Sequence, residues 1–308
     1  MWYNLLRKGG IKVGLKVTNV SKNFADKKAV DNISFTISSP GVFGLLGTNG
    51  AGKTTTIRMM LGIIKKDNGE ITWNGKEVTR KNVNFGYLPE ERGIYPKSKV
   101  IDQLVYFGKL KGMKKQDAIQ KIKYWAKRLE IEEYLELPAE KLSKGNQQKV
   151  QFIIAVMHNP ELIILDEPFS GLDPVNSQIL REIIMDLVKE GKYIVMSSHQ
   201  MTQIEEFCTD VVILNKGVTV LKGNLKEIKN SYPCNKLEIS TKEQIDKYIE
   251  EVGLNVQFSK NNEYDIEITD ENKAHELLKI LINNNINIMK FELKKPSLQD
   301  IFIEKVGE

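Results

Sequence analysis

The stretch from Gly47 to Thr55 restricts this chain more than any other part of it. It reads Gly-Thr-Asn-Gly-Ala-Gly-Lys-Thr-Thr and fits the pattern G-x-x-x-x-G-K-[ST] at every fixed position. An apolar run at 42–46 precedes it and can form a buried strand, while residues 55–61 can form a helix. Because this pattern holds phosphates when it connects a strand to a helix, we predict a nucleoside triphosphate site.

Each residue type in this loop has a physical role. The glycines let the backbone turn tightly and aim its N–H groups inward, and the helix that follows presents its positive end to the same phosphates. Lys53 can neutralise the β- and γ-phosphates, and the hydroxyl of Thr54 can hold Mg²⁺. The loop residues expected to bind the nucleotide are Gly47, Asn49, Gly50, Ala51, Gly52, Lys53, Thr54 and Thr55.

Length and composition limit the class of protein. A chain of 308 residues is expected to form two domains. The formal charge of +5 is mild and spread along the chain, so it does not argue for a nucleic-acid partner. Two cysteines and the absence of a signal-peptide pattern indicate a reducing cytosol. No apolar run is long enough to cross a bilayer, so a membrane role would require a partner.

The order of apolar patterns predicts the domains. Short alternating runs before the glycine-rich loop favour an antiparallel sheet edge, and continuous apolar runs at 162–165 and 193–196 favour a parallel core sheet. The expected segments are an N-terminal extension over 1–12, a nucleotide-binding domain over 13–230 with a helical insertion at about 91–160, and an accessory domain over 231–308.

The accessory domain has its own order of predicted strands and helices. Its pattern is β-α-β-β-α-β followed by a terminal helix, which predicts a small α+β domain of the ferredoxin-like type. It carries no glycine-rich phosphate loop and no paired carboxylates at a strand end. We therefore expect this domain to regulate or dimerise the protein and not to take part in catalysis.

Three further positions are candidates for the reaction, and a fourth is a candidate for binding the base. Asp166 and Glu167 end a buried strand, which is where sheets of this type place their ligands. We predict that Asp166 holds the metal and that Glu167 is the general base. His199 follows another buried strand and can sense the γ-phosphate. Phe24 lies at a turn where it could stack on an adenine base, or it could simply be a half-buried residue at a strand end.

Two more motifs resemble a known family. Residues 142–148, Leu-Ser-Lys-Gly-Asn-Gln-Gln, resemble the signature motif of ATP-binding cassette (ABC) ATPases, and residues 170–174, Ser-Gly-Leu-Asp-Pro, are similar to the D-loop of that family. With the loop and the carboxylates above, the resemblance covers residues 13–225. It implies an α/β P-loop cassette with an antiparallel β edge, a parallel core sheet and a helical insertion. It also implies that Phe24 stacks on the base.

The resemblance implies an arrangement of two chains. In the family, the signature faces the nucleotide of the other subunit, so two cassettes clamp two ATP molecules head to tail and hydrolysis releases the clamp. The residues that this places on the nucleotide are Ser143, Gly145, Asn146 and Asp173.

Two positions depart from the common family pattern. Lys144 replaces the first glycine of the signature, with Asn146 at its glutamine position, and Glu90 stands where a glutamine commonly touches Mg²⁺ and water. These departures, the loop at 88–96 and the ending at 296–302 resemble an exporter branch, the ABC-2 group that includes sodium-efflux ATPases. That branch carries a similar C-terminal domain.

The resemblance therefore implies the ATP-hydrolysing subunit of a multi-subunit ABC exporter. It would work with ATP and Mg²⁺ as a homodimer, or paired with another ABC subunit, at the cytoplasmic face of the membrane beneath integral permease subunits. Apolar residues that could receive the permease, or belong to the core, are Ile94, Tyr95, Val100, Ile101, Leu104 and Tyr106.

Two other functions compete with the exporter. A soluble ABC ATPase acting on ribosomes or DNA usually carries a second cassette or a long coiled-coil insertion, and this chain shows neither. A regulatory module that binds ATP without turnover would not need Lys53, Asp166, Glu167 and His199 together.

Overall fold

A computed structural model describes residues 14–25, 27–79, 83–91 and 93–307, and the expected N-terminal extension lies outside these ranges. The chain divides into two compact units, one up to Gly223 and one from Asn224 onward. The helix α7 (Leu225–Asn230) is thus part of the second unit, whereas the sequence analysis expected the second domain to begin after it. The two units are described separately below.

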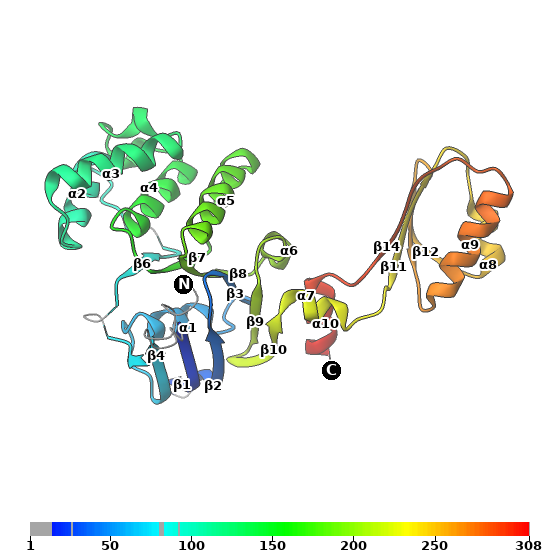
Figure 1. Ribbon diagram of the computed structural model, residues 1–308, viewed down its shortest axis with the longest axis horizontal. Helices are drawn as coiled ribbons and strands as arrows, with labels where there is room; N and C mark the ends of the chain where they lie inside the picture. Colours follow the sequence, from blue (N-terminus) through cyan, green and yellow to red (C-terminus); the bar gives the residue numbers. More distant parts are fainter. Residues whose placement is uncertain (1–13, 26, 80–82, 92, 308) are drawn as a thin grey trace, which may run out of the picture. The chain divides into compact units, whose positions relative to one another are not determined.

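A six-stranded sheet forms the centre of the first unit (Figure 1). Its strand order is β10-β9-β3-β8-β7-β6, and the pairs within β9-β3-β8-β7-β6 are parallel. Its strands β7 and β8 are buried along their whole length, which is why their sequences are nearly continuous in apolar residues. The strands are β3 (Gly41–Gly47), β6 (Phe85–Leu88), β7 (Leu162–Asp166), β8 (Tyr193–Ser198), β9 (Asp210–Asn215) and β10 (Val218–Asn224).

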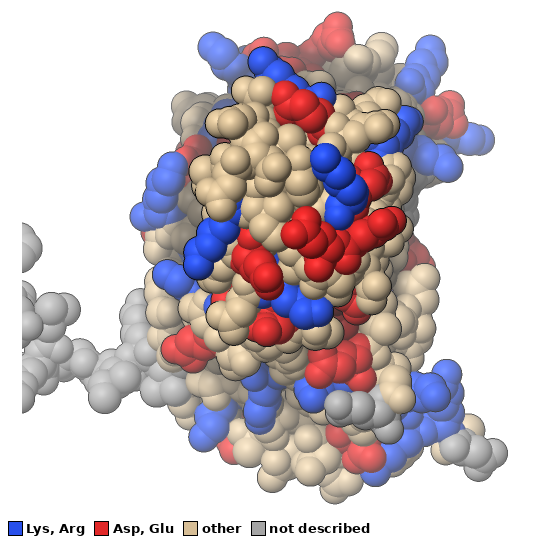
Figure 2. Space-filling view, turned by 90° about the vertical axis from the view of Figure 1, so that its right-hand side faces the viewer, with Lys and Arg blue, Asp and Glu red and all other residues tan. Residues whose placement is uncertain are grey.

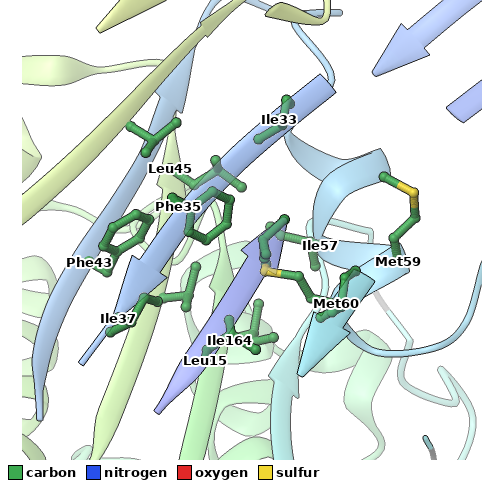
Figure 3. Close-up of a cluster of buried hydrophobic side chains, with 14 of the residues drawn as sticks. Leu15, Ile33, Phe35, Ile37, Phe43, Leu45, Ile57, Met59, Met60 and Ile164 are labelled. Carbon is green, nitrogen blue, oxygen red and sulfur yellow. The ribbon is translucent and has the colours of Figure 1, made fainter. Parts of the chain in front are cut away.

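A second, antiparallel sheet in the order β2-β1-β4-β5 belongs to the same unit. Its strands are β1 (Leu15–Phe24), β2 (Lys27–Ile37), β4 (Asn68–Trp73) and β5 (Lys76–Glu77). Side chains of both sheets and of helix α1 (Lys53–Met60) share one core, in which the rings of Phe35 and Phe43 stack at 5.0 Å (Figure 3). This core holds the end of β3 against the start of α1, and thereby fixes the loop between them.

Helices account for the expected insertion. They are α2 (Val100–Leu110), α3 (Lys115–Arg128) and α4 (Lys144–Val156), with short 3-10 turns at Glu132–Tyr134 and Ala139–Lys141. The helix α5 (Pro174–Lys189) follows β7, and the short helix α6 (Met201–Glu205), which the sequence analysis did not foresee, follows β8. The α/β cassette fold predicted from the sequence is confirmed.

The second unit contains a four-stranded antiparallel sheet in the order β12-β13-β11-β14, with helices α8 and α9 on one side (Figure 1). The order along the chain matches the predicted β-α-β-β-α-β pattern, and the unit has a core of its own. The elements are β11 (Lys236–Thr241), α8 (Asp246–Val252), β12 (Asn255–Lys260), β13 (Glu263–Glu267), α9 (Glu271–Asn283), β14 (Ile288–Lys294) and α10 (Leu298–Gly307).

The sequence pattern predicts a helix over 242–252, but helix α8 begins at Asp246, four residues later (246 minus 242). Tertiary contacts explain the difference. The hydroxyl of Thr241 donates to the backbone oxygen of Glu243 (2.7 Å), and the Glu243 carboxylate accepts hydrogen bonds from Asn287 at 2.6 and 2.9 Å. These bonds hold the segment before α8 as a turn against the start of β14, although its composition also suits a helix.

Candidate nucleotide and hydrolysis site

The glycine-rich loop connects β3 to α1 with backbone angles that only glycine adopts easily. Gly47 has φ 144° and Gly52 has φ 102°. A Cβ atom at Gly47 would lie 2.2 Å from the backbone oxygen of Leu214, and one at Gly52 would lie 2.6 Å from that of Ala29. The two glycines therefore let the loop pass close to its neighbours, and α1 begins directly after Gly52 with its N-terminal end at the loop.

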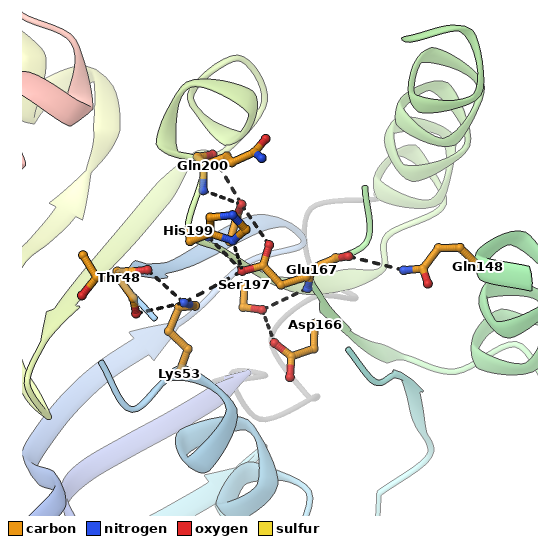
Figure 4. A network of polar contacts seen from close by, with 10 residues as sticks. Thr48, Lys53, Gln148, Asp166, Glu167, Ser197, His199 and Gln200 are labelled. Atoms are coloured by element: carbon orange, nitrogen blue, oxygen red, sulfur yellow. Dashed lines mark hydrogen bonds and ion pairs between the residues drawn. The ribbon is translucent and has the colours of Figure 1, made fainter. Parts of the chain in front are cut away.

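Lys53 lies at the centre of the site (Figure 4). Its ammonium donates to the backbone oxygens of Gly47 (2.9 Å) and Thr48 (3.2 Å) and lies 3.9 Å from Oε1 of Glu167. Burial lowers the pKa of Lys53, and the charges of Glu167, Asp166 and Glu90 oppose that shift. The lysine is therefore held over the loop, close to three carboxylates.

Lys53, Glu167 and part of the glycine-rich loop border one cavity of about 590 Å³. Phe24 lies on its wall with 46% of its surface exposed, as a ring that accepts a base must be. The cavity is lined by Phe24, Lys27, Lys28, Ala29, Asn49, Gly50, Gly52, Lys53, Thr54, Thr55, Glu90, Glu167 and Lys216. The structure thus brings Phe24 and Glu90, predicted from distant parts of the sequence, to the same cavity as the loop.

Four lining residues were not predicted. Lys27, Lys28 and Ala29 follow Phe24 along the chain, and Lys216 occupies the turn between β9 and β10. The sequence pattern places Lys27 and Lys28 in a polar turn and Lys216 in the turn of a predicted hairpin, and nothing local distinguishes a lysine at a cavity wall from one in solvent. The one available signal was that Lys27, Lys28 and Ala29 are close to Phe24 in the sequence.

Asp166 ends β7 and is fully buried. Its Oδ1 accepts a hydrogen bond from the hydroxyl of Ser197, and the Thr54 hydroxyl is close enough to lower the pKa of the carboxyl group. The other oxygen, Oδ2, has no hydrogen-bond partner among the described residues. Burial raises the pKa of Asp166. A buried carboxylate oxygen without a partner, beside a threonine hydroxyl, fits a hard divalent cation such as Mg²⁺.

The protein alone does not offer a full set of metal ligands there. Across the described ranges, no group of three or more His, Cys, Asp or Glu side chains is arranged to hold a metal. A cation at Thr54 and Asp166 would complete its coordination with phosphate oxygens and water, which is the usual way in which Mg²⁺ is held in nucleotide sites.

Glu167 follows Asp166 in a left-handed backbone conformation, φ 51°, which is uncommon for a residue with a side chain and is frequent at functional sites. Oε1 of its carboxylate accepts from the backbone N–H of His199 (2.9 Å) and lies 2.8 Å from the ring atom Nδ1 of the same residue. The Gln148 side chain donates to the backbone oxygen of Glu167 at 3.3 Å. His199 and Gln148 thus hold the side chain and the backbone of Glu167, respectively (Figure 4).

The predicted signature and D-loop residues do not line this cavity. The Ser143 hydroxyl caps α4 by accepting from the N–H of Asn146 at 3.2 Å, and Asp173 caps α5 by accepting from the N–H of Asn176 at 2.9 Å. A Cβ at Gly145 would lie 3.1 Å from the backbone oxygen of Gly171, so the signature packs against the D-loop. Within one chain these residues have local structural roles, and their contact with a nucleotide stays a prediction.

The apolar residues expected to receive a permease fall into three groups. Val100 and Leu104 are fully buried and belong to the core, while Ile94 and Ile101 are half-buried. Tyr95 and Tyr106 are 52% and 48% exposed, and their ring centroids lie 6.4 Å apart. Only the two tyrosines therefore present large apolar surfaces to a partner.

Comparisons with known proteins identify the family of the chain. The family model "ABC transporter" matches residues 30–170, and the model "ATP-binding protein DrrA1-3-like, C-terminal domain" matches residues 223–306. The chain is 47% identical to the uncharacterized ABC transporter ATP-binding protein YhaQ of Bacillus subtilis, covering 95% of this chain and 98% of that protein. It is 30% identical to the bacitracin transport ATP-binding protein BcrA of Bacillus licheniformis, covering 95% and 97%.

Among solved structures, an ATP-binding subunit of an ABC transporter matches with a TM-score of 0.65 and 28% identity, over 70% of this chain and 92% of that one.

Proposed function

The chain belongs to the family of ABC transporter ATP-binding proteins, and on this premise we propose that it is the ATP-hydrolysing subunit of an ABC exporter. The observation that carries the proposal is the convergence of Lys53, Asp166, Glu167 and His199 on the glycine-rich loop. A module that only binds ATP would not need a carboxylate held by a histidine beside the phosphates. The similarity to BcrA, whose name gives bacitracin transport as its role, supports transport as the process that is powered.

The residues of the site divide the work of hydrolysis. The N–H groups of the loop and the N-terminal end of α1 bind the phosphates, and Lys53 neutralises the charge on the β- and γ-phosphates. Thr54 and Asp166 would hold Mg²⁺, which neutralises further negative charge on the phosphate oxygens. Glu167 orients the attacking water and accepts its proton, and His199 fixes the Glu167 carboxylate through the two contacts at its Oε1.

A complete site requires two chains in this proposal. Ser143, Gly145, Asn146 and Asp173 of one chain face the nucleotide bound by the loop of the other. The α4 helix (Lys144–Val156) begins at Ser143, so its positive end would approach the γ-phosphate of that second nucleotide. ATP would then hold the two chains together, and its hydrolysis would release them.

Transport itself would take place in separate permease subunits. No helix in the described part of the chain is long and apolar enough to cross a membrane. We propose that the exposed Tyr95 and Tyr106 contact the permease and place the cassette at the cytoplasmic face of the membrane. On the face shown in Figure 2, basic and acidic side chains are interspersed, which supports a partner other than nucleic acid.

Co-purification tests the exporter proposal. When the protein is isolated from detergent-solubilised membranes of cells that express it, an integral membrane protein is expected to accompany it, and replacing Tyr95 and Tyr106 with serine is expected to reduce that recovery. The matched control is Tyr124→Ser, an equally exposed tyrosine of α3. Recovery of ribosomes or DNA in place of a membrane protein would contradict the proposal.

Glu90 gives a prediction about the metal. Glu90 lines the cavity, and its charge raises the pKa of both Lys53 and Asp166. It therefore adds negative charge near the proposed Mg²⁺ position. Glu90→Gln is expected to raise the Mg²⁺ concentration for half-maximal hydrolysis roughly 3- to 10-fold, because one nearby charge is lost, while ATP affinity changes less. The measurement is a Mg²⁺ titration of ATPase activity. Glu91→Gln, which removes the adjacent charge outside the cavity lining, is the control, and equal titrations for all three proteins would place Glu90 outside the metal site.

The second unit gives a prediction about domain roles. The cores of the two units share no residues, and every lining residue of the nucleotide cavity precedes Gly223. A chain that ends at Asn224 keeps β10 whole and is expected to fold and bind ATP with unchanged affinity, while dimer stability or coupling to transport falls. Isothermal titration with ATP and gel filtration measure the two effects. A folded, soluble truncation that no longer binds ATP would show that the second unit completes the site.

A further inference from the structure

The turn between β9 and β10 is bonded to the glycine-rich loop. The N–H of Gly217 donates to the backbone oxygen of Ala51 at 3.1 Å, and the backbone oxygen of Gly217 accepts from the N–H of Asp31 at 2.8 Å. Gly217 has φ 85°, and a Cβ there would lie 2.9 Å from the oxygen of Ala29. The turn is therefore fixed against both the loop and strand β2, and its position does not depend on side-chain contacts.

This turn carries Lys216, which lines the nucleotide cavity. Among the described residues, no carboxylate lies within ion-pair distance of its ammonium. Two of the other three lysines of the wall differ in this respect: Lys28 pairs with Asp31 at 2.6 Å, and Lys53 lies near three carboxylates. Lys27, like Lys216, forms no ion pair within the described ranges. Within the described ranges, Lys216 thus adds a cation to the cavity that no nearby acid neutralises.

The position of the turn indicates which end of a nucleotide Lys216 would reach. Gly217 packs against Ala29, and in the pairing of β1 with β2 the neighbouring Lys27 lies opposite Phe24. The same turn is bonded to Ala51 of the glycine-rich loop, so Lys216 lies between the strand pair that carries the proposed base-stacking ring and the loop that would bind the phosphates. Glu167, the proposed base, instead lies beside Lys53, where the γ-phosphate would bind.

We propose that Lys216 is a nucleotide-binding residue whose ammonium contacts the phosphate nearest the ribose, which ATP and ADP share. This proposal rests on the nucleotide binding assigned to the cavity above. Because the contact is the same before and after hydrolysis, it contributes equally to the binding of substrate and product. It changes the KM for ATP and leaves kcat unaltered, since such a uniform contact does not favour the transition state.

The test compares nucleotide affinities of full-length variants at low ionic strength. Lys216→Gln is expected to weaken both ATP and ADP roughly 5- to 10-fold, because a charge-assisted contact with phosphate is lost, and Lys216→Arg is expected to stay within about twofold of wild type. In 0.5 M salt the difference is expected to shrink, because screening weakens a contact open to solvent. Saturating ATP is expected to give the wild-type kcat in Lys216→Gln.

The control is Lys222→Gln, which removes a lysine from the same hairpin whose ammonium donates to the backbone oxygen of Ser34 instead of lining the nucleotide cavity. It is expected to leave both affinities unchanged. Wild-type affinities in Lys216→Gln would overturn the proposal, and so would a loss for ATP without a loss for ADP, which would place the lysine at the γ-phosphate. Failure of the wild-type protein and of the Lys222 control to bind ATP would instead contradict the nucleotide site itself.

Discussion

Lys53→Ala is expected to remove nearly all ATP binding, with affinity falling roughly 100-fold because a buried charge-assisted contact with the β- and γ-phosphates is lost. The structure adds a second cause. The Lys53 ammonium donates to the backbone oxygens of Gly47 and Thr48, so the substitution also frees the loop that holds the phosphates. Equilibrium binding of a fluorescent ATP analogue measures the loss, and circular dichroism establishes that the variant is folded.

Lys66→Ala is the matched control for this prediction. It also removes a lysine that forms an ion pair, here with Glu77 at 2.8 Å, but it leaves the cavity lining intact. Wild-type affinity is expected for it. Wild-type affinity in Lys53→Ala as well would contradict the assignment of the glycine-rich loop as the phosphate site.

Glu167→Gln is expected to bind ATP normally and to hydrolyse it roughly 10² to 10⁴-fold more slowly, the usual contribution of a positioned general base. The amide oxygen of glutamine can still accept from the N–H of His199, so the local backbone and the position of the histidine should be kept. Single-turnover measurements separate the slow chemical step from binding. A variant that turns over at the wild-type rate would show that Glu167 is not the base.

The same variant tests the two-chain site. If hydrolysis separates the two chains, Glu167→Gln with ATP and Mg²⁺ is expected to elute from gel filtration as a dimer, whereas wild type returns to monomer as ATP is consumed. Glu182→Gln neutralises an exposed acid on α5 whose carboxylate accepts from the Gln178 side chain, and it should behave as wild type. A monomeric Glu167 variant with ATP bound would contradict the clamp in which Ser143 and Asp173 face the second nucleotide.

Local sequence determined the glycine-rich loop, the helix after it, the buried strands that end at Asp166 and Ser198, and the pattern of the second unit. Each of these leaves a requirement that is visible in the local sequence. The turn at Gly47 needs a glycine, an amphipathic helix needs its own spacing of apolar residues, and a doubly buried strand needs a continuous apolar run. Such requirements can be recognised before any strand has a neighbour.

The tertiary structure alone decided which of these pieces meet. β7 and β8 lie side by side, and this pairing places the Ser197 hydroxyl on Asp166 and the His199 N–H on Glu167. The register of β1 with β2 and the bonds of the β9–β10 turn bring Lys28 and Lys216 to the cavity that holds Lys53.

Helix α8 likewise begins at Asp246 because Glu243 bonds with Asn287, a residue far along the chain. No local pattern encodes such partners, because the packing of the whole core selects the order of strands in a sheet. A polar side chain in a turn also has the same sequence signature in solvent and at a binding site.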